Sequence, residues 1–287
     1  MSPCQTILRG DFPLSKRTKV GLTSSQRLHF DIYGFVVLKQ VLTKNEIREL
    51  YQSLQLAKSM IDKGSELSPI YTHRIGKHHI LMGNLIQYHK SLLDYAVHPK
   101  LIPLVEDVVG GEVRLEETEA IINRRDPEKN PPKVNLQRYQ PTAFHRGTKH
   151  GWGTYIEQDK FHCVFVKTLA YLTDVGRDDG GTTLIPGSHK LTWPEKDIVE
   201  AALADDNLLY QIEAKAGDIL LFAESLIHST TAIRSENERT ILVAGYTPTM
   251  FQPWPGNEVD PEFIASLPPE IQPIISGSSS WHWRRNY

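Results

Sequence analysis

His228 and Arg239 have side chains that can hold a metal ion and an acidic ligand next to each other. His228 ends an apolar stretch, Glu224 lies just before it, and Arg239 stands on the next predicted strand. Imidazole and carboxylate ligands bind iron(II) and leave positions open, while a guanidinium pairs bidentately with a carboxylate. A histidine at the end of an apolar strand is equally typical of a buried core residue, so this interpretation needs a second imidazole.

His145 is the best candidate for that second imidazole. It precedes His228 by a long stretch of sequence, so the two side chains would come from different strands. A histidine between a phenylalanine and an Arg-Gly pair is also typical of a loop. His150 and His162 are nearby competitors, and His162 stands at the start of a predicted strand beside Cys163. We interpret His145 and His228 as the pair of metal-binding imidazoles.

Short strands separated by turn residues dominate the chain after residue 112. Gly-Gly at 180–181 and Pro-Gly at 186–187 favour turns, and regular short strands of this kind are typical of an all-β domain. The strands that we predict are 113–122, 134–139, 164–172, 182–185, 210–214, 218–222 and 240–246. We therefore predict a mainly β fold with flanking helices, a double-stranded β-helix or cupin-like jelly roll.

The first third of the chain is predicted to be helical and to pack on that β domain. Thr43 and Glu46 have the spacing of a capping box, and a short apolar run at 34–38 indicates a buried strand. The predicted helices are 45–63, 99–109 and, between strands, 195–204. Residues 1–22 are expected to form an irregular lead-in, and residues 23–287 a single domain.

The composition excludes several classes of function. Of the 287 residues, 40% are hydrophobic and 23% are charged, and the formal net charge is −2. There is no basic block to neutralise phosphates and no apolar stretch near the ~20 residues of a membrane span, so we expect no nucleic acid or membrane partner. Cys4 and Cys163 form no zinc or disulfide pattern, and the N-terminus lacks the apolar segment of a signal peptide. We expect a cytoplasmic protein that acts on a small molecule.

Several phrases of the chain resemble the phytanoyl-CoA dioxygenase family. These phrases are 30–38, 172–190 with its Pro-Gly-Ser-His-Lys ending, and 217–222 with the following His228 and Arg239. The resemblance spans roughly 28–247, and 251–283 is similar to the tail of a bacterial branch. It implies an oxygenase that uses iron(II), 2-oxoglutarate and dioxygen. By position it implies His228 as an iron ligand and Arg239 as the 2-oxoglutarate anchor, with Thr230 as a helper.

The chain departs from the family at the His-x-Asp motif, because residues 145–147 read His-Arg-Gly. Three interpretations remain open. In the first, another acid supplies the carboxylate, and Glu224 is preferred over Glu157 and Asp159. In the second, Gly147 leaves a vacancy for halide, as in related 2-oxoglutarate halogenases. In the third, the iron site is lost and the fold is a non-catalytic, cupin-like binding protein.

We adopt the first interpretation as the prediction. The protein is expected to be an iron(II)- and 2-oxoglutarate-dependent dioxygenase that hydroxylates a small organic molecule and releases succinate and carbon dioxide. His145, Glu224 and His228 would bind iron, while Arg239 and Thr230 would bind 2-oxoglutarate. The same oxidant can also halogenate, desaturate or cyclise a substrate.

Residues near His145 are candidates for contact with the substrate. Arg146, His150 and His162 lie in this part of the sequence. Their positive character would suit an anionic substrate, but it is equally typical of a solvated loop. The histidine-containing segment 70–88 and the aromatic-basic segment 152–162 are expected to line the entrance of the pocket.

Overall fold

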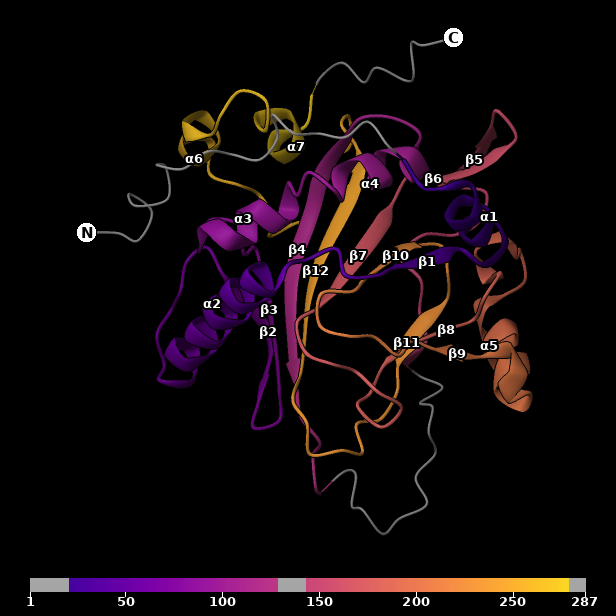
Figure 1. Ribbon diagram of the computed structural model, residues 1–287, viewed down its shortest axis with the longest axis horizontal. Coiled ribbons are helices and arrows are strands. Elements are labelled where there is room, and N and C mark those ends of the chain that lie inside the picture. The colour runs from indigo at the N-terminus through magenta and orange to yellow at the C-terminus, as the bar shows by residue number, and fades with distance from the viewer. Residues whose placement is uncertain (1–20, 129–142, 279–287) are drawn as a thin grey trace.

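Two β-sheets that face each other form the centre of the protein (Figure 1). The structure is a computed structural model and describes residues 21–128 and 143–278. The larger sheet has seven strands in the order β1-β10-β7-β12-β4-β3-β2, and the smaller has three in the order β11-β8-β9. All of their pairings are antiparallel, as expected for a jelly roll.

Most of the strands are short, and helices flank them in both the first and the last part of the described chain. The strands are β1 (Phe35–Leu38), β2 (Tyr71–Gly76), β3 (His79–Gly83), β4 (Val113–Asn123), β5 (Thr154–Glu157), β6 (Lys160–Cys163), β7 (Val166–Tyr171), β8 (Thr182–Leu184), β9 (Tyr210–Gln211), β10 (Ile219–Ala223), β11 (His228–Thr230) and β12 (Arg239–Pro248). The helices are α1 (Ser24–Tyr33), α2 (Lys44–Asp62), α3 (Lys90–Ala96), α4 (Ile102–Val109), α5 (Glu195–Ala204), α6 (Pro261–Ser266) and α7 (Gln272–Ser276).

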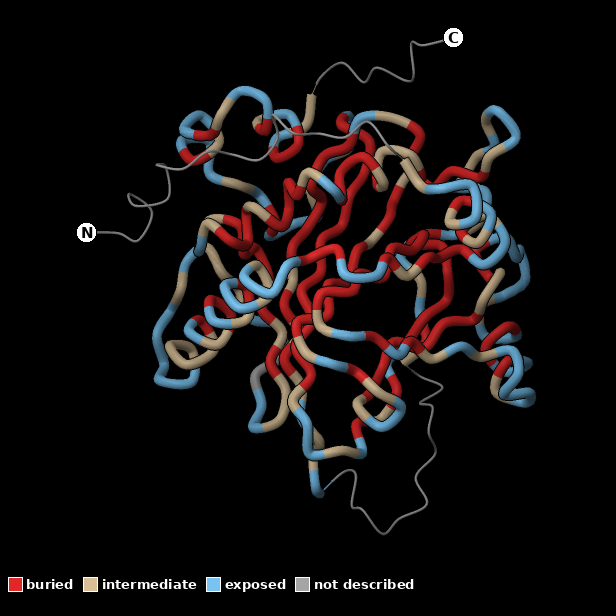
Figure 2. Tube along the Cα trace, viewed as in Figure 1, coloured by how far each residue is buried: buried red, intermediate tan, exposed pale blue. Residues whose placement is uncertain are grey.

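The two faces of the larger sheet pack against different layers. On β7, Val166 and Ala170 belong to the core shared with α2, α3 and α4, whereas Leu169 and Tyr171 belong to the core shared with the smaller sheet. This division follows from the alternation of side chains along a strand. Figure 2 shows both sheets as largely buried chain. The face toward the smaller sheet is therefore the inside of the jelly roll, where a ligand site can form.

The predicted fold class is confirmed, and the capping box is one of its clearest local signals. The Thr43 hydroxyl accepts from the Glu46 amide at 3.3 Å, and α2 begins at the next residue, Lys44. The predicted helix 99–109 is shorter than expected, because α4 begins only at Ile102. The predicted strand 134–139 lies outside the described residues. Helix α3 and the β2–β3 hairpin were not predicted.

The state of Cys163 and the lengths of the helices bear on what the composition led us to expect about disulfides and membrane spans. Cys163 is buried and free, and its thiol donates to the carbonyl of Phe165 at 2.9 Å. In the part of the chain that the structure describes, no helix has the length and apolar character needed to cross a bilayer.

Candidate active site

The backbone brings His145, which is exposed, next to His228, which is buried. The two residues face each other across an antiparallel bridge, and each amide donates to the other's carbonyl at 2.9 Å. Their ring centroids lie 4.3 Å apart. The edge of Phe222, on β10, packs against the His228 ring at 4.8 Å between centroids. The two imidazoles chosen from the sequence are therefore neighbours.

Backbone carbonyls orient both rings. Nδ1 of His145 lies 2.9 Å from the carbonyl of Ala143, and Nδ1 of His228 lies 2.9 Å from that of Leu226. A carbonyl only accepts, so each Nδ1 holds the proton and each Nε2 keeps its lone pair for a metal. Burial, and then the neighbouring His145, lower the pKa of His228 well below its usual value. The ring is thus held in the neutral form that binds metals.

The side chain of Glu224 fills the space beside Gly147. A Cβ atom at position 147 would lie 2.5 Å from Cγ of Glu224 and 2.6 Å from its Oε1. The Gly147 amide donates to the Glu224 carbonyl at 3.0 Å, which fixes the two backbones together. The Glu224 side chain therefore lies where the side chain of any larger residue at position 147 would begin.

One oxygen of Glu224 has a partner and the other has none. Oε1 lies 3.4 Å from the Lys167 ammonium, whereas Oε2 is buried with no hydrogen bond among the described residues. An orphaned carboxylate oxygen is costly to bury, and a cation would satisfy it. Within the described residues, no group of three or more histidine, cysteine, aspartate or glutamate side chains lies close enough together to hold a metal. The two imidazoles are thus next to each other, while the Glu224 carboxylate is paired with the Lys167 ammonium.

The weaker carboxylate candidates lie elsewhere. Glu157 ends β5, and Asp159 stands in the turn before β6 with a positive φ of 59°. Neither residue is part of the cavity lining described below, whereas Glu224 is.

Arg239 is a buried cation with no acidic partner among the described residues. It is 2% exposed, and its Nη1 donates to the carbonyl of Gly180. Its Nε has no hydrogen-bond partner in the described part of the chain. Burial lowers the pKa of Arg239 to about 10, an effect that the nearby Tyr171 partly opposes. A buried guanidinium in this state fits an anionic ligand, because an unpaired buried charge is otherwise unfavourable.

The wall between His228 and Arg239 is polar. Thr230 shares a face of β11 with His228 and pairs with Thr182 on β8. The Tyr171 hydroxyl donates to the Thr182 hydroxyl at 3.2 Å. Thr230 is exposed at the edge of this wall. Its predicted contact with 2-oxoglutarate stays a prediction.

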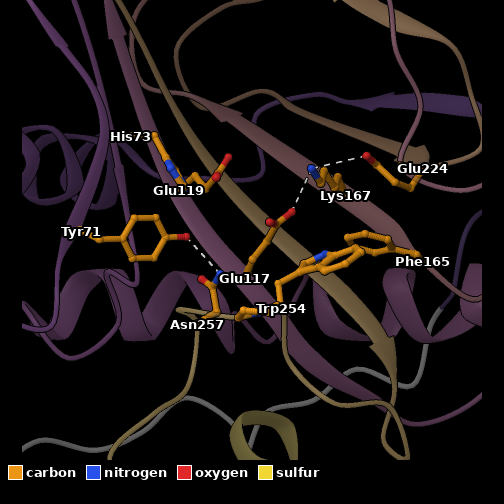
Figure 3. A pocket seen from close by; sticks show the side chains of 11 residues that line it. Tyr71, His73, Glu117, Glu119, Phe165, Lys167, Glu224, Trp254 and Asn257 are labelled. Atoms are coloured by element: carbon orange, nitrogen blue, oxygen red, sulfur yellow. Dashed lines mark hydrogen bonds and ion pairs between the residues drawn. The ribbon is translucent and has the colours of Figure 1, made fainter.

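A cavity of about 320 Å³ opens beside Gly147 and Glu224 (Figure 3). Its described lining comes from β2, β4, β7, the residues next to β7 and β10, the loop before β5 and the segment after β12: Tyr71, His73, Glu117, Glu119, Gly147, Phe165, Lys167, Glu224, Trp254, Pro255 and Asn257. Burial opposes the charge on Lys167, but Glu224, Glu117 and Glu119 outweigh it and raise the pKa of that ammonium. Lys167 thus stays charged between carboxylates.

None of the predicted substrate residues is part of the described lining of this cavity. The Arg146 guanidinium pairs with Glu195 at 3.3 Å, and the hydroxyl of Thr154 lies 3.4 Å from Nδ1 of His150. His162 is fully buried and stacks on Tyr155 at 4.9 Å. The charged residues of the described lining are three acids and Lys167, and the contact of Arg146, His150 and His162 with substrate stays a prediction.

Some of the residues that line the cavity were predicted from the sequence and others were not. The segment 70–88 was expected at the entrance, and its Tyr71 and His73 do line the cavity. Sequence reasoning missed Glu117, Glu119 and Lys167. The sequence did contain a signal for them, because charged residues within a strand are rarely directed into the interior of a protein unless they serve a site.

The jelly roll thus carries two neighbouring imidazoles, a buried carboxylate and an arginine with no acidic partner among the described residues, an arrangement typical of metal- and carboxylate-binding enzymes of the double-stranded β-helix class. The sequence profile described as phytanoyl-CoA dioxygenase (PhyH) matches residues 30–241, so the chain belongs to this family. Family membership confirms the expected class, an iron- and 2-oxoglutarate-dependent oxygenase.

Several relatives agree with this assignment. Dioxygenase af480 of Aspergillus fumigatus is 26% identical over 253 residues, which cover 86% of this chain and 72% of that protein. HygX from Streptomyces hygroscopicus, crystallised with nickel, 2-oxoglutarate and hygromycin B, has a TM-score of 0.63 and 25% identity, and the match covers 81% of this chain and 90% of HygX. The carbocyclase SnoK from nogalamycin biosynthesis shares the fold with a TM-score of 0.56 and 16% identity, over 84% and 95% of the two chains.

Proposed function

We propose that this oxygenase hydroxylates a small organic molecule, with iron(II) held by His145, His228 and Glu224. The observation that carries the proposal is the pairing of two imidazoles beside a buried carboxylate, Glu224, that has one free oxygen. Two imidazoles and one carboxylate form the facial set of an oxygen-activating iron site with open positions. HygX was crystallised with nickel and 2-oxoglutarate bound, which supports the binding of a metal ion and 2-oxoglutarate by this chain.

The protein's part in the reaction is to position, to hold charge and to exclude water. Bound iron, with 2-oxoglutarate and dioxygen, would supply the oxidising chemistry, and succinate and carbon dioxide would be released. Arg239 would pair with the far carboxylate of 2-oxoglutarate, which would remove its own uncompensated charge. Lys167 pairs with Oε1 of Glu224 at 3.4 Å, and Phe222 covers one side of the His228 ring.

Glu224 would have to turn its carboxylate toward the two imidazoles on metal binding. The ion pair with Lys167 leaves Oε2 without a partner, so the side chain gains an interaction when a cation arrives. Lys167 keeps a partner in this rearrangement, because Glu117 lies 2.9 Å from its ammonium. The rearrangement therefore strands no buried charge.

Hydroxylation is favoured over halogenation by the contact between Gly147 and Glu224. A halide would need the space in which the Glu224 carboxylate lies, 2.6 Å from the position of a Cβ at residue 147. A carboxylate so placed leaves the open positions of the iron for 2-oxoglutarate and dioxygen.

Anaerobic addition of iron(II) and 2-oxoglutarate tests the proposed function. We expect the weak visible charge-transfer band of the chelate, and succinate formation without substrate once air is admitted. H145A and H228A should lose the band, whereas the matched variant H150A should keep it. Wild-type protein that shows neither the band nor succinate would rule out the proposal.

A further inference from the structure

The ionisable groups of the cavity leave one carboxylate without a partner. Lys167 lies 2.9 Å from Glu117 and 3.4 Å from Glu224, so a single ammonium serves two acids. Glu119, the third acid of the lining, has no ion pair or hydrogen bond within the described residues. Figure 3 shows its carboxylate beside His73, on the side of the cavity away from Lys167.

The surroundings of Glu119 disfavour its negative charge as long as the cavity holds no cation. Burial, and then the charge of Glu117, raise the pKa of Glu119 to about 7, while Lys167 opposes the shift and Glu224 adds to it. A cation that enters the cavity would remove this penalty. An anion would add a further repulsion to three existing carboxylates.

Aromatic rings form much of the remaining wall. Trp254 packs against Phe165 with ring centroids 6.1 Å apart, and Tyr71 is held by Asn257, whose amide donates to the Tyr71 hydroxyl at 3.0 Å. Trp254 is 47% exposed although it borders the cavity, so its ring is available to a ligand. Aromatic faces together with a carboxylate are the surroundings that bind organic ammonium groups.

We infer that the substrate is a small organic amine whose ammonium group pairs with Glu119 while its carbon skeleton packs along Tyr71 and Trp254. This inference rests on the proposed function, because the same cavity borders Glu224, the carboxylate that we assign to the iron. The bound amine would present a C–H bond on the side toward Glu224, and its charge would lie on the opposite side.

The amine preference can be measured with two sets of probes, each of which keeps one ring skeleton and carries an ammonium, a neutral or a carboxylate substituent. The sets are D-glucosamine, D-glucose and D-glucuronate, and cyclohexylamine, cyclohexanol and cyclohexanecarboxylate. Calorimetric titration of the full-length protein, both metal-free and loaded anaerobically with iron(II) and 2-oxoglutarate, should show an amine bound at least tenfold more tightly than its neutral and acidic counterparts.

E119Q should abolish that preference, because glutamine keeps the shape and removes the charge. E213Q is the matched control, since Glu213 is exposed and outside the cavity, and it should retain the wild-type preference. Equal binding within both sets, tighter binding of an acid, or no binding of either amine would overturn the inference. Such a result with an intact charge-transfer band rejects only the amine, whereas a missing band rejects the proposed function itself.

Discussion

Moving the carboxylate from position 224 to position 147 is the sharpest perturbation that the site offers. E224A removes the acid, and G147D restores the aspartate of the family's His-x-Asp motif. Gly147 is not among the glycines with positive φ, so its backbone accepts an aspartate. The two single variants should each bind iron poorly, and the double variant G147D/E224A should bind it well.

The contact between the two residues sets the expected magnitudes. A Cβ at 147 would lie 2.5 Å from Cγ of Glu224, so in G147D one side chain must move, at an overpacking cost of about 1–3 kcal/mol. Loss of the hydrogen-bonded supports of a ligand weakens metal binding by roughly 10–100-fold, and loss of a ligand itself, as in E224A, should cost at least ~100-fold, about 2.7 kcal/mol. The double variant has neither defect and should return to within about tenfold of the wild type.

Anaerobic equilibrium dialysis of iron(II) with metal analysis measures these affinities without any turnover. Thermal unfolding with and without metal gives an independent reading, because a ligand at 100 times its Kd adds about 2.7 kcal/mol of stability. A matched control is E213A, which should bind iron like the wild type. If E224A retains full iron affinity, or if G147D/E224A binds no better than E224A, then Glu224 is not the missing ligand.

Three further predictions concern single residues. R239Q should weaken 2-oxoglutarate binding by roughly 10–100-fold, the worth of a charge-assisted hydrogen bond, with little change in iron affinity, as measured by titrating the charge-transfer band. K167M should lower the free energy of unfolding by about 3–5 kcal/mol in denaturant titrations, because Glu117 and Glu224 would be left buried without a cation. The folded-state pKa of Glu119, about 7, lies above its usual 4.5, so this residue lowers stability as pH rises from 4.5 to 7. E119Q should therefore be more stable than the wild type by about 1–2 kcal/mol at pH 8, after allowance for partial exposure, and the difference should vanish near pH 4. A constant difference across this range would contradict the role given to Glu119.

The pairing of His145 with His228 could be predicted because both residues stand in phrases with strong local signals. The capping box at Thr43 and the turn-rich phrase around β8 are signals of the same kind, since short-range chemistry fixes their structure. The family resemblance then supplied the ligand roles of His228 and Arg239, which their spacing alone would have left open.

The cavity could not be predicted, because its walls meet only in the folded chain. Tyr71, Glu119, Lys167 and Trp254 come from β2, β4, β7 and the segment after β12, and no sequence spacing links them. The partners of the basic residues near His145 could not be predicted for a related reason. Arg146 has a partner on α5, Glu195, that is far away in sequence, so its charge is used within the protein.

The central claim is that the imidazoles of His145 and His228 and the carboxylate of Glu224 converge on one iron, with Arg239 at the far end of 2-oxoglutarate. A crystal structure of the protein grown anaerobically with iron(II) and 2-oxoglutarate tests it most directly. We predict iron on Nε2 of both histidines and on the Glu224 carboxylate, released from Lys167, with the distal carboxylate of 2-oxoglutarate on the Arg239 guanidinium. Iron bound elsewhere, or 2-oxoglutarate anchored by another cation, would contradict it.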